Sequence, residues 1–261
     1  MMDITSNLGP AFLLTLIAGL STGIGSAIAF FLKKPNIKYL CFTLGLSAGV
    51  MLYVSFVELL PEGFDGVGRI WGLYAFFSGI IVIGIIDVLV PNIENPHHYP
   101  KMDMDKDNQK VDHKLMRVGI FAALAIAIHN FPEGIATFAS ALVDVNLGII
   151  ITFAIALHNI PEGIAISFPI FFATGDRKKA FIYSFLSGFS EPAGAVIGFL
   201  ILMPFLSDWI LSFLLAFIAG IMVYISADEL LPTAHQYGHG HCVILGLILG
   251  MFIMALSLLF L

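Results

Sequence analysis

The sequence predicts an all-α integral membrane protein in which eight transmembrane helices form an inverted repeat. Three observations lead to this prediction: the composition, the succession of apolar segments, and the similarity of two segments in opposite halves of the chain. Of the 261 residues, 59% are hydrophobic and only 11% are charged, and the mean hydropathy is +0.96. A soluble globular chain has about 45–50% apolar and about 25% charged residues. This composition is therefore typical of a chain that crosses a lipid bilayer repeatedly.

Eight apolar windows follow one another along the chain, each close to the roughly 20 residues that a helix needs to cross a bilayer. Only one connection is long, at about 91–115. It is rich in Asp, Lys and His and lacks apolar periodicity, so we expect it to be mobile. We expect a single transmembrane domain over residues 1–261. The expected spans are approximately 9–32, 39–61, 70–90, 116–142, 147–173, 180–204, 209–231 and 242–261.

The distribution of Lys and Arg predicts the orientation of these helices, because cytosolic loops are enriched in both residues. Eleven of the twelve Lys and Arg residues fall in alternate connections: after the first, third and fifth expected helices. Only Arg69 lies on the other side. We therefore expect a multi-pass protein of the cell membrane, in the inner membrane where a cell has two, with both termini outside the cytosol.

Two segments in opposite halves of the chain are similar. The segment GVMLYVSFVELLP at 49–61 shares eight of thirteen residues with GIMVYISADELLP at 220–232. They lie on the second and seventh expected helices, which cross the membrane in opposite directions. The hexapeptides HNFPEG and HNIPEG lie on the fourth and fifth helices, which are also antiparallel. Such matched pairs indicate an inverted repeat, an architecture that is common in secondary transporters.

Several expected helices contain pairs of glycines four residues apart. Small residues let helices approach closely in lipid, where no hydrophobic force draws them together. We interpret these glycines as packing positions without chemistry of their own. The pairs are Gly19 and Gly23, Gly45 and Gly49, Gly194 and Gly198, and Gly246 and Gly250.

The two hexapeptides place polar side chains where lipid favours apolar ones. Successive residues of a helix are about 100° apart, so the histidine and glutamate of each copy share one face, and the asparagine completes the same arc. Pro132 and Pro161 cannot donate to the preceding turn, so each leaves a carbonyl free for another partner. The candidate ligands of the two copies are His129, Asn130, Glu133, His158, Asn159 and Glu162.

A third buried carboxylate is expected from the sixth helix, where the segment SEPAG contains Glu191. Insertion scales assign about 2.5–3.5 kcal/mol to a charged residue near the centre of a membrane helix. Three ionised and unpaired carboxylates would then cost about 8–10 kcal/mol, which is comparable with the whole stability of a fold. No Lys or Arg is expected at the same depth. The carboxylates therefore need protons, water or a bound cation.

The set of candidate ligands favours a divalent metal. Two imidazoles, three carboxylates and two amide oxygens suit Zn²⁺, Fe²⁺, Mn²⁺ or Co²⁺, and the absence of cysteine from the set argues against Cu⁺. Seven groups exceed one tetrahedral shell, so two adjacent ions are an alternative to one. A buried polar network that only holds the helices together is the structural alternative. We expect no resident cofactor, and the metal would be a substrate.

Three functions compete at this point. A divalent-metal transporter accounts for the full ligand set. An intramembrane metal-dependent hydrolase would require His-Glu-x-x-His, whereas here asparagine follows each histidine. A proton-linked transporter of a small solute would use the glutamates but would leave the matched histidines and asparagines unexplained. The chain has no basic stripe for nucleic acid and no phosphate-binding loop for ATP.

The hexapeptides HNFPEG and HNIPEG, on the fourth and fifth of eight helices, also connect the chain with a known family. The chain resembles, over its whole length, the ZIP (Zrt/Irt-like) family of metal transporters, and most closely its bacterial ZupT-type branch. The resemblance implies a transporter, not an enzyme, that moves divalent metal into the cytosol without ATP. Zinc is the expected substrate, with iron, manganese, cobalt and cadmium as open alternatives, because branch members differ in the metals that they accept.

The resemblance also implies where the metal is held. One metal position would be formed by His129, Glu133, His158 and Glu162. The neighbouring position would be formed by Asn130, Asn159 and Glu191 together with the shared glutamates. Many family members have a histidine-rich loop between the third and fourth helices, but here that loop contains only His97, His98 and His113. The partners expected are divalent metal ions and the lipid bilayer, and not nucleic acid, while a homodimer is left open.

Overall fold

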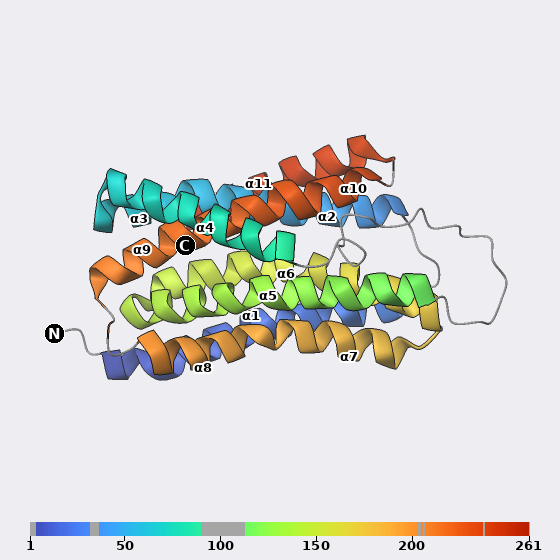
Figure 1. Cartoon of the computed structure of the whole chain (residues 1–261), viewed down its shortest axis with the longest axis horizontal. Coiled ribbons are helices and arrows are strands. Elements are labelled where there is room, and N and C mark those ends of the chain that lie inside the picture. Colours follow the sequence, from blue (N-terminus) through green and yellow to red (C-terminus); the bar gives the residue numbers. More distant parts are fainter. Residues whose placement is uncertain are drawn as a thin grey trace.

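The fold is built from helices that run along the long axis of the molecule (Figure 1). It was obtained as a computed structural model that describes residues 4–31, 37–89, 113–202, 205, 207–236 and 238–260. These residues form helices and short connections, without a strand. The expected loop at about 91–115 lies almost entirely outside the described residues, so its mobility stays a prediction.

In the described part of the chain, the helices form eight long passes in the expected order. Seven of them are long and apolar enough to span a membrane, and the remaining one, α5, contains 31 residues. The passes are α1 (Ile4–Phe31), α2 (Ile37–Val54) with α3 (Leu60–Val67), α4 (Arg69–Leu89), α5 (His113–Val143), α6 (Val145–Thr174), α7 (Arg177–Gly188) with α8 (Ser190–Leu202), α9 (Asp208–Tyr224) with α10 (Leu231–Gln236), and α11 (Gly240–Phe260). The prediction of an all-α membrane protein is confirmed.

The second and seventh passes each contain a π-helical turn, η1 (Ser55–Leu59) and η4 (Ile225–Leu230). A proline follows each turn at the second residue after it, and it cannot donate a hydrogen bond to the preceding turn. A π-helical turn accommodates an irregular register without ending the helix. Both passes therefore continue beyond the ends expected from the sequence. In each, a leucine donates its N–H to a serine carbonyl five residues earlier: Leu60 to Ser55, and Leu231 to Ser226.

The sixth pass is interrupted directly before Glu191, where α7 and α8 meet at Phe189. Pro192 explains the break, because it cannot donate to the carbonyl of Gly188 four residues earlier. Gly19 on α1 packs against this carbonyl, since a Cβ at Gly19 would lie 2.6 Å from it. The span expected at about 180–204 corresponds to this pass, which is apolar over Arg177–Ile201, but the sequence analysis did not anticipate the interruption. The break places Glu191 in the first turn of α8.

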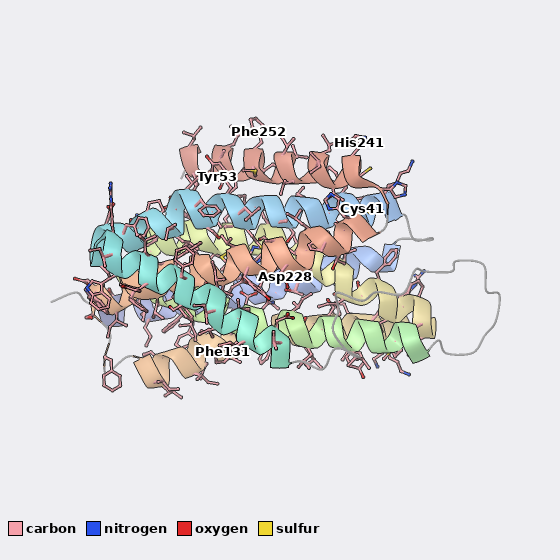
Figure 2. All side chains as sticks on the ribbon, turned by 45° about the horizontal axis from the view of Figure 1, so that its top comes forward. Cys41, Tyr53, Phe131, Asp228, His241 and Phe252 are labelled. Carbon is pink, nitrogen blue, oxygen red and sulfur yellow. The ribbon has the colours of Figure 1, made fainter. Side chains whose placement is uncertain are left out.

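The passes divide into two groups that lie against each other (Figure 1). The first group consists of α1, α5, α6 and the α7–α8 pass, which pack on one another. The second group consists of the α2–α3 pass, α4, the α9–α10 pass and α11, and in it α11 packs mainly on α2 while α4 packs on α9. Figure 2 shows α11 along one edge of the molecule, beside α2. The helix α6 contacts α2 and thus joins the two groups.

Equivalent glycine contacts relate the two halves of the second group. Gly49 on α2 approaches the carbonyl of Leu247 on α11, and Gly220 on α9 approaches the carbonyl of Phe76 on α4. A Cβ would lie 2.1 Å and 2.0 Å from these oxygens. Each residue of one contact is 171 positions from its counterpart in the other. The antiparallel pair of segments at 49–61 and 220–232 thus makes the same contact twice, which supports the expected inverted repeat.

The outer surface of the molecule is apolar. Leu200, Leu259, Ile70 and Val88 are each more than two-thirds exposed, and they come from three different passes. Large contiguous apolar surfaces are rare on soluble monomers, whereas lipid tails solvate them. The described polar side chains of the two hexapeptides lie inside the helix bundle instead.

The glycine contacts generate a stability prediction. Replacing Gly49 with Ala places a Cβ against a backbone oxygen of α11, which cannot move without displacing the helix. We expect Gly49→Ala to lower the free energy of unfolding by about 1–3 kcal/mol, as overpacking does elsewhere. The measurement is the thermal unfolding temperature of the purified protein in detergent.

Gly240→Ala is the matched control, because Gly240 also lies within a helix, but a Cβ there would meet only the side chain of His235, at an ordinary contact distance of 3.6 Å. Alanine is the better helix former, so this variant should be as stable as the parent protein or slightly more stable. An equal loss of stability in both variants would contradict the role of the close contact.

Candidate functional site

The predicted polar side chains come together between α5, α6 and α8. The helix α5 supplies Asn130 and Glu133, and α8 supplies Glu191. The side chain of His129, also on α5, lies outside the described residues, so its predicted role stays a prediction. The other predicted ligands are fully buried, with no exposed surface: Asn130, Glu133, His158, Asn159, Glu162 and Glu191.

One contact joins the two hexapeptides. Nε2 of His158 on α6 lies 3.1 Å from Oε2 of Glu133 on α5, and both side chains are fully buried. The histidine of the second copy therefore meets the glutamate of the first across the helix interface. An imidazole and a carboxylate in this arrangement can share a proton, or can both coordinate a cation.

A second contact joins α6 to α8. Nδ2 of Asn159 donates a hydrogen bond to Oε1 of Glu191, and also lies 3.0 Å from the carbonyl oxygen of Ala18 on α1. The amide thus connects three helices and fixes the side chain of Glu191 by one of its two oxygens. The first turn of α8, created by the break at Phe189, is what brings this carboxylate to α6.

The site contains more buried oxygen atoms than hydrogen-bond donors. Among the described residues, Oε1 of Glu133, Oε2 of Glu191, Oδ1 of Asn159 and both polar atoms of Asn130 have no hydrogen-bond partner. The sequence has no Lys or Arg between residues 118 and 176 or after residue 179, so no basic side chain of α6, α8 or the later helices can neutralise the carboxylates. The site is therefore rich in acceptors and suited to a positively charged ligand.

The described side chains approach one another in pairs rather than as a closed metal shell. Within the described part of the chain, no three His, Cys, Asp or Glu side chains stand together so that they could hold a metal ion. The pairs formed are His158 with Glu133 and Asn159 with Glu191. The two metal positions that the sequence analysis implied therefore stay predictions.

Two glycines of the hexapeptides determine how closely the helices of the site pack. A Cβ at Gly134 would lie 2.0 Å from the carbonyl oxygen of Glu191, and a Cβ at Gly163 would lie 2.1 Å from that of Thr22 on α1. Only glycine allows α5 to lie this close to α8, and α6 this close to α1. The proline and the glycine of each hexapeptide thus have different roles: the proline leaves a backbone carbonyl without its helical donor, and the glycine permits close contact with the neighbouring helix.

Serine hydroxyls from neighbouring helices support the backbone of α6, which the sequence analysis did not anticipate. Ser184 on α7 donates to the carbonyl of Gly163 at 3.1 Å, and Ser26 on α1 reaches the same oxygen at 3.5 Å. Ser47 on α2 lies 3.5 Å from the carbonyl of His158. The only signal in the sequence is a small polar residue within an apolar window, which is too common to single out.

A bundle of long apolar helices that encloses fully buried carboxylates defines a multi-pass membrane protein with a polar site between its helices. A family model described as ZIP Zinc transporter matches residues 8–258, which is nearly the whole chain. The chain belongs to this family, as the doubled hexapeptide indicated.

Curated relatives support the same assignment. The chain is 59% identical to a zinc transporter ZupT of Chlorobium phaeovibrioides, over 98% of this chain and 99% of the relative. It is 57% identical to a zinc transporter ZupT of Oceanobacillus iheyensis, over 96% and 97% of the two chains. It is 53% identical to a zinc transporter ZupT of Clostridium perfringens, over 98% of each. The family is one of transporters, so the protein is not an enzyme, and the hydrolase alternative is not supported.

Proposed function

We propose that the protein moves zinc, or another divalent transition metal, through the membrane into the cytosol by a secondary or facilitated process that does not use ATP. One observation carries this proposal: Glu133 and His158, from the two different hexapeptides, meet fully buried at 3.1 Å. The two motif copies thus build one site rather than two. The similarity to proteins named zinc transporters makes zinc the first candidate.

The chemistry of the site follows from its charges. A divalent ion that leaves water needs negative charge and electron pairs, and Glu133, Glu162 and Glu191 supply charge in the interior of the bundle. His129 and His158 add nitrogen ligands that zinc accepts readily. We propose His129, Glu133, His158 and Glu162 as one metal position, and Asn130, Asn159 and Glu191 with the shared glutamates as the neighbouring one. The contact with the imidazole of His158 holds the carboxylate of Glu133 in place until a cation binds.

We further propose that residues 1–261 form one transport domain with both termini outside the cytosol, in the inner membrane where a cell has two. The family match over residues 8–258 supports the single domain. The eleven Lys and Arg residues in alternate connections support the orientation. The homodimer stays a prediction.

The first functional prediction concerns two of the carboxylates. We expect Glu133→Ala and Glu162→Ala each to reduce zinc uptake into proteoliposomes to the level of empty vesicles, because each removes a negative charge from a desolvated dication. Asp65→Ala is the matched control, since Asp65 is an exposed carboxylate at the end of α3 and should be dispensable. Uptake near the wild-type rate by either glutamate variant, at equal protein in the membrane, would refute the proposed site.

The second functional prediction concerns orientation. In a variant with Cys41 and Cys242 replaced by Ala, Asn108→Cys should resist an impermeant thiol reagent added to intact cells, because the loop after α4 is placed in the cytosol. Asp65→Cys in the same background is the control and should react, since the end of α3 is placed outside. The opposite pattern of labelling would reverse the proposed orientation.

A further inference from the structure

The first group of helices obeys an internal symmetry that can be followed residue by residue. The two hexapeptides are 29 positions apart, so Gly134 corresponds to Gly163. Gly134 approaches the carbonyl of Glu191, and Gly163 approaches the carbonyl of Thr22. The same relation holds one turn further on, where Gly194 approaches the carbonyl of Phe131 and Gly25 approaches that of Ile160. The α7–α8 pass thus corresponds to α1 with a displacement of 169 positions.

Gly19 and Gly188 correspond to each other and are in mutual contact, and by the same displacement Glu191 corresponds to Thr22. A Cβ at Gly19 would meet the carbonyl of Gly188, and a Cβ at Gly188 would meet the carbonyl of Gly19. A Cβ at Gly19 would also lie 3.5 Å from the Cβ of Glu191, and a Cβ at Gly188 would lie 2.7 Å from the Cβ of Thr22. The carboxylate of the sixth pass therefore has a hydroxyl as its counterpart on α1.

By this correspondence Asn130 is the counterpart of Asn159 and Thr22 is the counterpart of Glu191, but no hydrogen bond joins Asn130 to Thr22. Both side chains are fully buried. Oγ1 of Thr22 and both polar atoms of Asn130 have no hydrogen-bond partner among the described residues. Buried polar side chains nearly always have a partner, so three such atoms on two residues that correspond to Asn159 and Glu191 require an explanation.

The usual acceptor of a helical threonine is already occupied. Thr15 on the same helix donates to the carbonyl of Ala11 four residues earlier, at 2.9 Å. The equivalent acceptor for Thr22 is the carbonyl of Ala18, which already accepts hydrogen bonds from Ser21 at 2.5 Å and from Asn159 at 3.0 Å. The hydroxyl of Thr22 is therefore left with its donor and its oxygen both available.

We propose that Thr22 and Asn130 form a neutral oxygen subsite for the transported divalent cation, opposite the acidic subsite of Asn159 and Glu191. The proposal rests on the transport function proposed above. A hydroxyl and an amide oxygen offer electron pairs without charge, and they can equally hold water that the ion retains. The ion is then bound tightly on one side only, which allows it to leave again. Thr22 is thus a residue that sets the apparent affinity for the cation.

The test is zinc uptake by the full-length protein in proteoliposomes over a series of Zn²⁺ concentrations. Thr22→Val removes the hydroxyl and keeps the shape. We expect the KM for Zn²⁺ to rise about five- to tenfold with the maximal rate within about twofold, as for the loss of one hydrogen-bonding contact of ordinary strength. Thr22→Ser keeps the hydroxyl and should retain the wild-type KM.

Thr15→Val is the matched control, because Thr15 is equally buried on the same helix but its hydroxyl is bonded within the helix. It should leave KM unchanged. The alternative is that Thr22 has only a structural role. In that case Thr22→Val, which removes an unpartnered buried hydroxyl, should raise the thermal unfolding temperature and leave KM unchanged. An unchanged KM in Thr22→Val, or an equal rise in Thr15→Val, would overturn the proposal.

Two further results keep the test decisive. If Thr22→Val does not reach the membrane, Thr22→Ala replaces it, since it is smaller and makes no new contact, and the same rise in KM is expected. If the wild-type protein takes up zinc and Glu133→Ala does not, an unchanged KM in the Thr22 variants rejects the neutral subsite alone. Wild-type uptake that Glu133→Ala and Glu162→Ala leave unaffected would instead reject the transport site on which the proposal rests.

Discussion

The structure depends on the presence of carboxylates in the interior of a membrane protein. Glu133, Glu162 and Glu191 are fully buried, and the sequence provides no Lys or Arg on the helices that follow residue 179. At about 2.5–3.5 kcal/mol each in insertion measurements, such groups would consume most of the stability of a typical domain, about 5–15 kcal/mol. The helices around them approach closely enough to exclude lipid, and we propose that a cation compensates their charge.

Close approach is achieved with backbone atoms rather than with large side chains. Gly134 allows α5 to approach α8, and Gly163 allows α6 to approach α1. Gly19 packs against the carbonyl of Gly188, to which Pro192 cannot donate a hydrogen bond. The break at Phe189 and the two π-helical turns arise near prolines in the same way. Irregular backbone inside a membrane is tolerated where protein surrounds it, which is the case here. The symmetric arrangement is chemically unequal at several positions, and Glu191 and Thr22 are the pair that differs in charge within the site.

The sequence was sufficient for the number of passes, the repeat and the burial of the described polar side chains, because apolar length, paired motifs and charged residues at membrane depth are strong local signals. It was not sufficient for the irregular turns. A proline shows that a donor is missing, but whether the helix breaks, as before Glu191, or continues through a π turn, as at η1, depends on the neighbouring helices. Thr22 was also missed, because one hydroxyl in an apolar window has no distinguishing pattern. Its position became visible only through contacts that repeat across α1 and α8.

The central claim is that the cation transported by the protein stabilises its buried carboxylates. The most direct measurement is thermal unfolding of the purified protein, titrated with Zn²⁺ at about pH 7 and about pH 5. A ligand that binds only the folded state adds about 2.7 kcal/mol at a hundredfold excess over its Kd. We expect Zn²⁺ to raise the Tm at neutral pH and to raise it less in acid, because carboxylate and imidazole ligands must lose protons to bind metal. A Tm that does not respond to Zn²⁺ at neutral pH, or that rises equally at both pH values, would contradict the account.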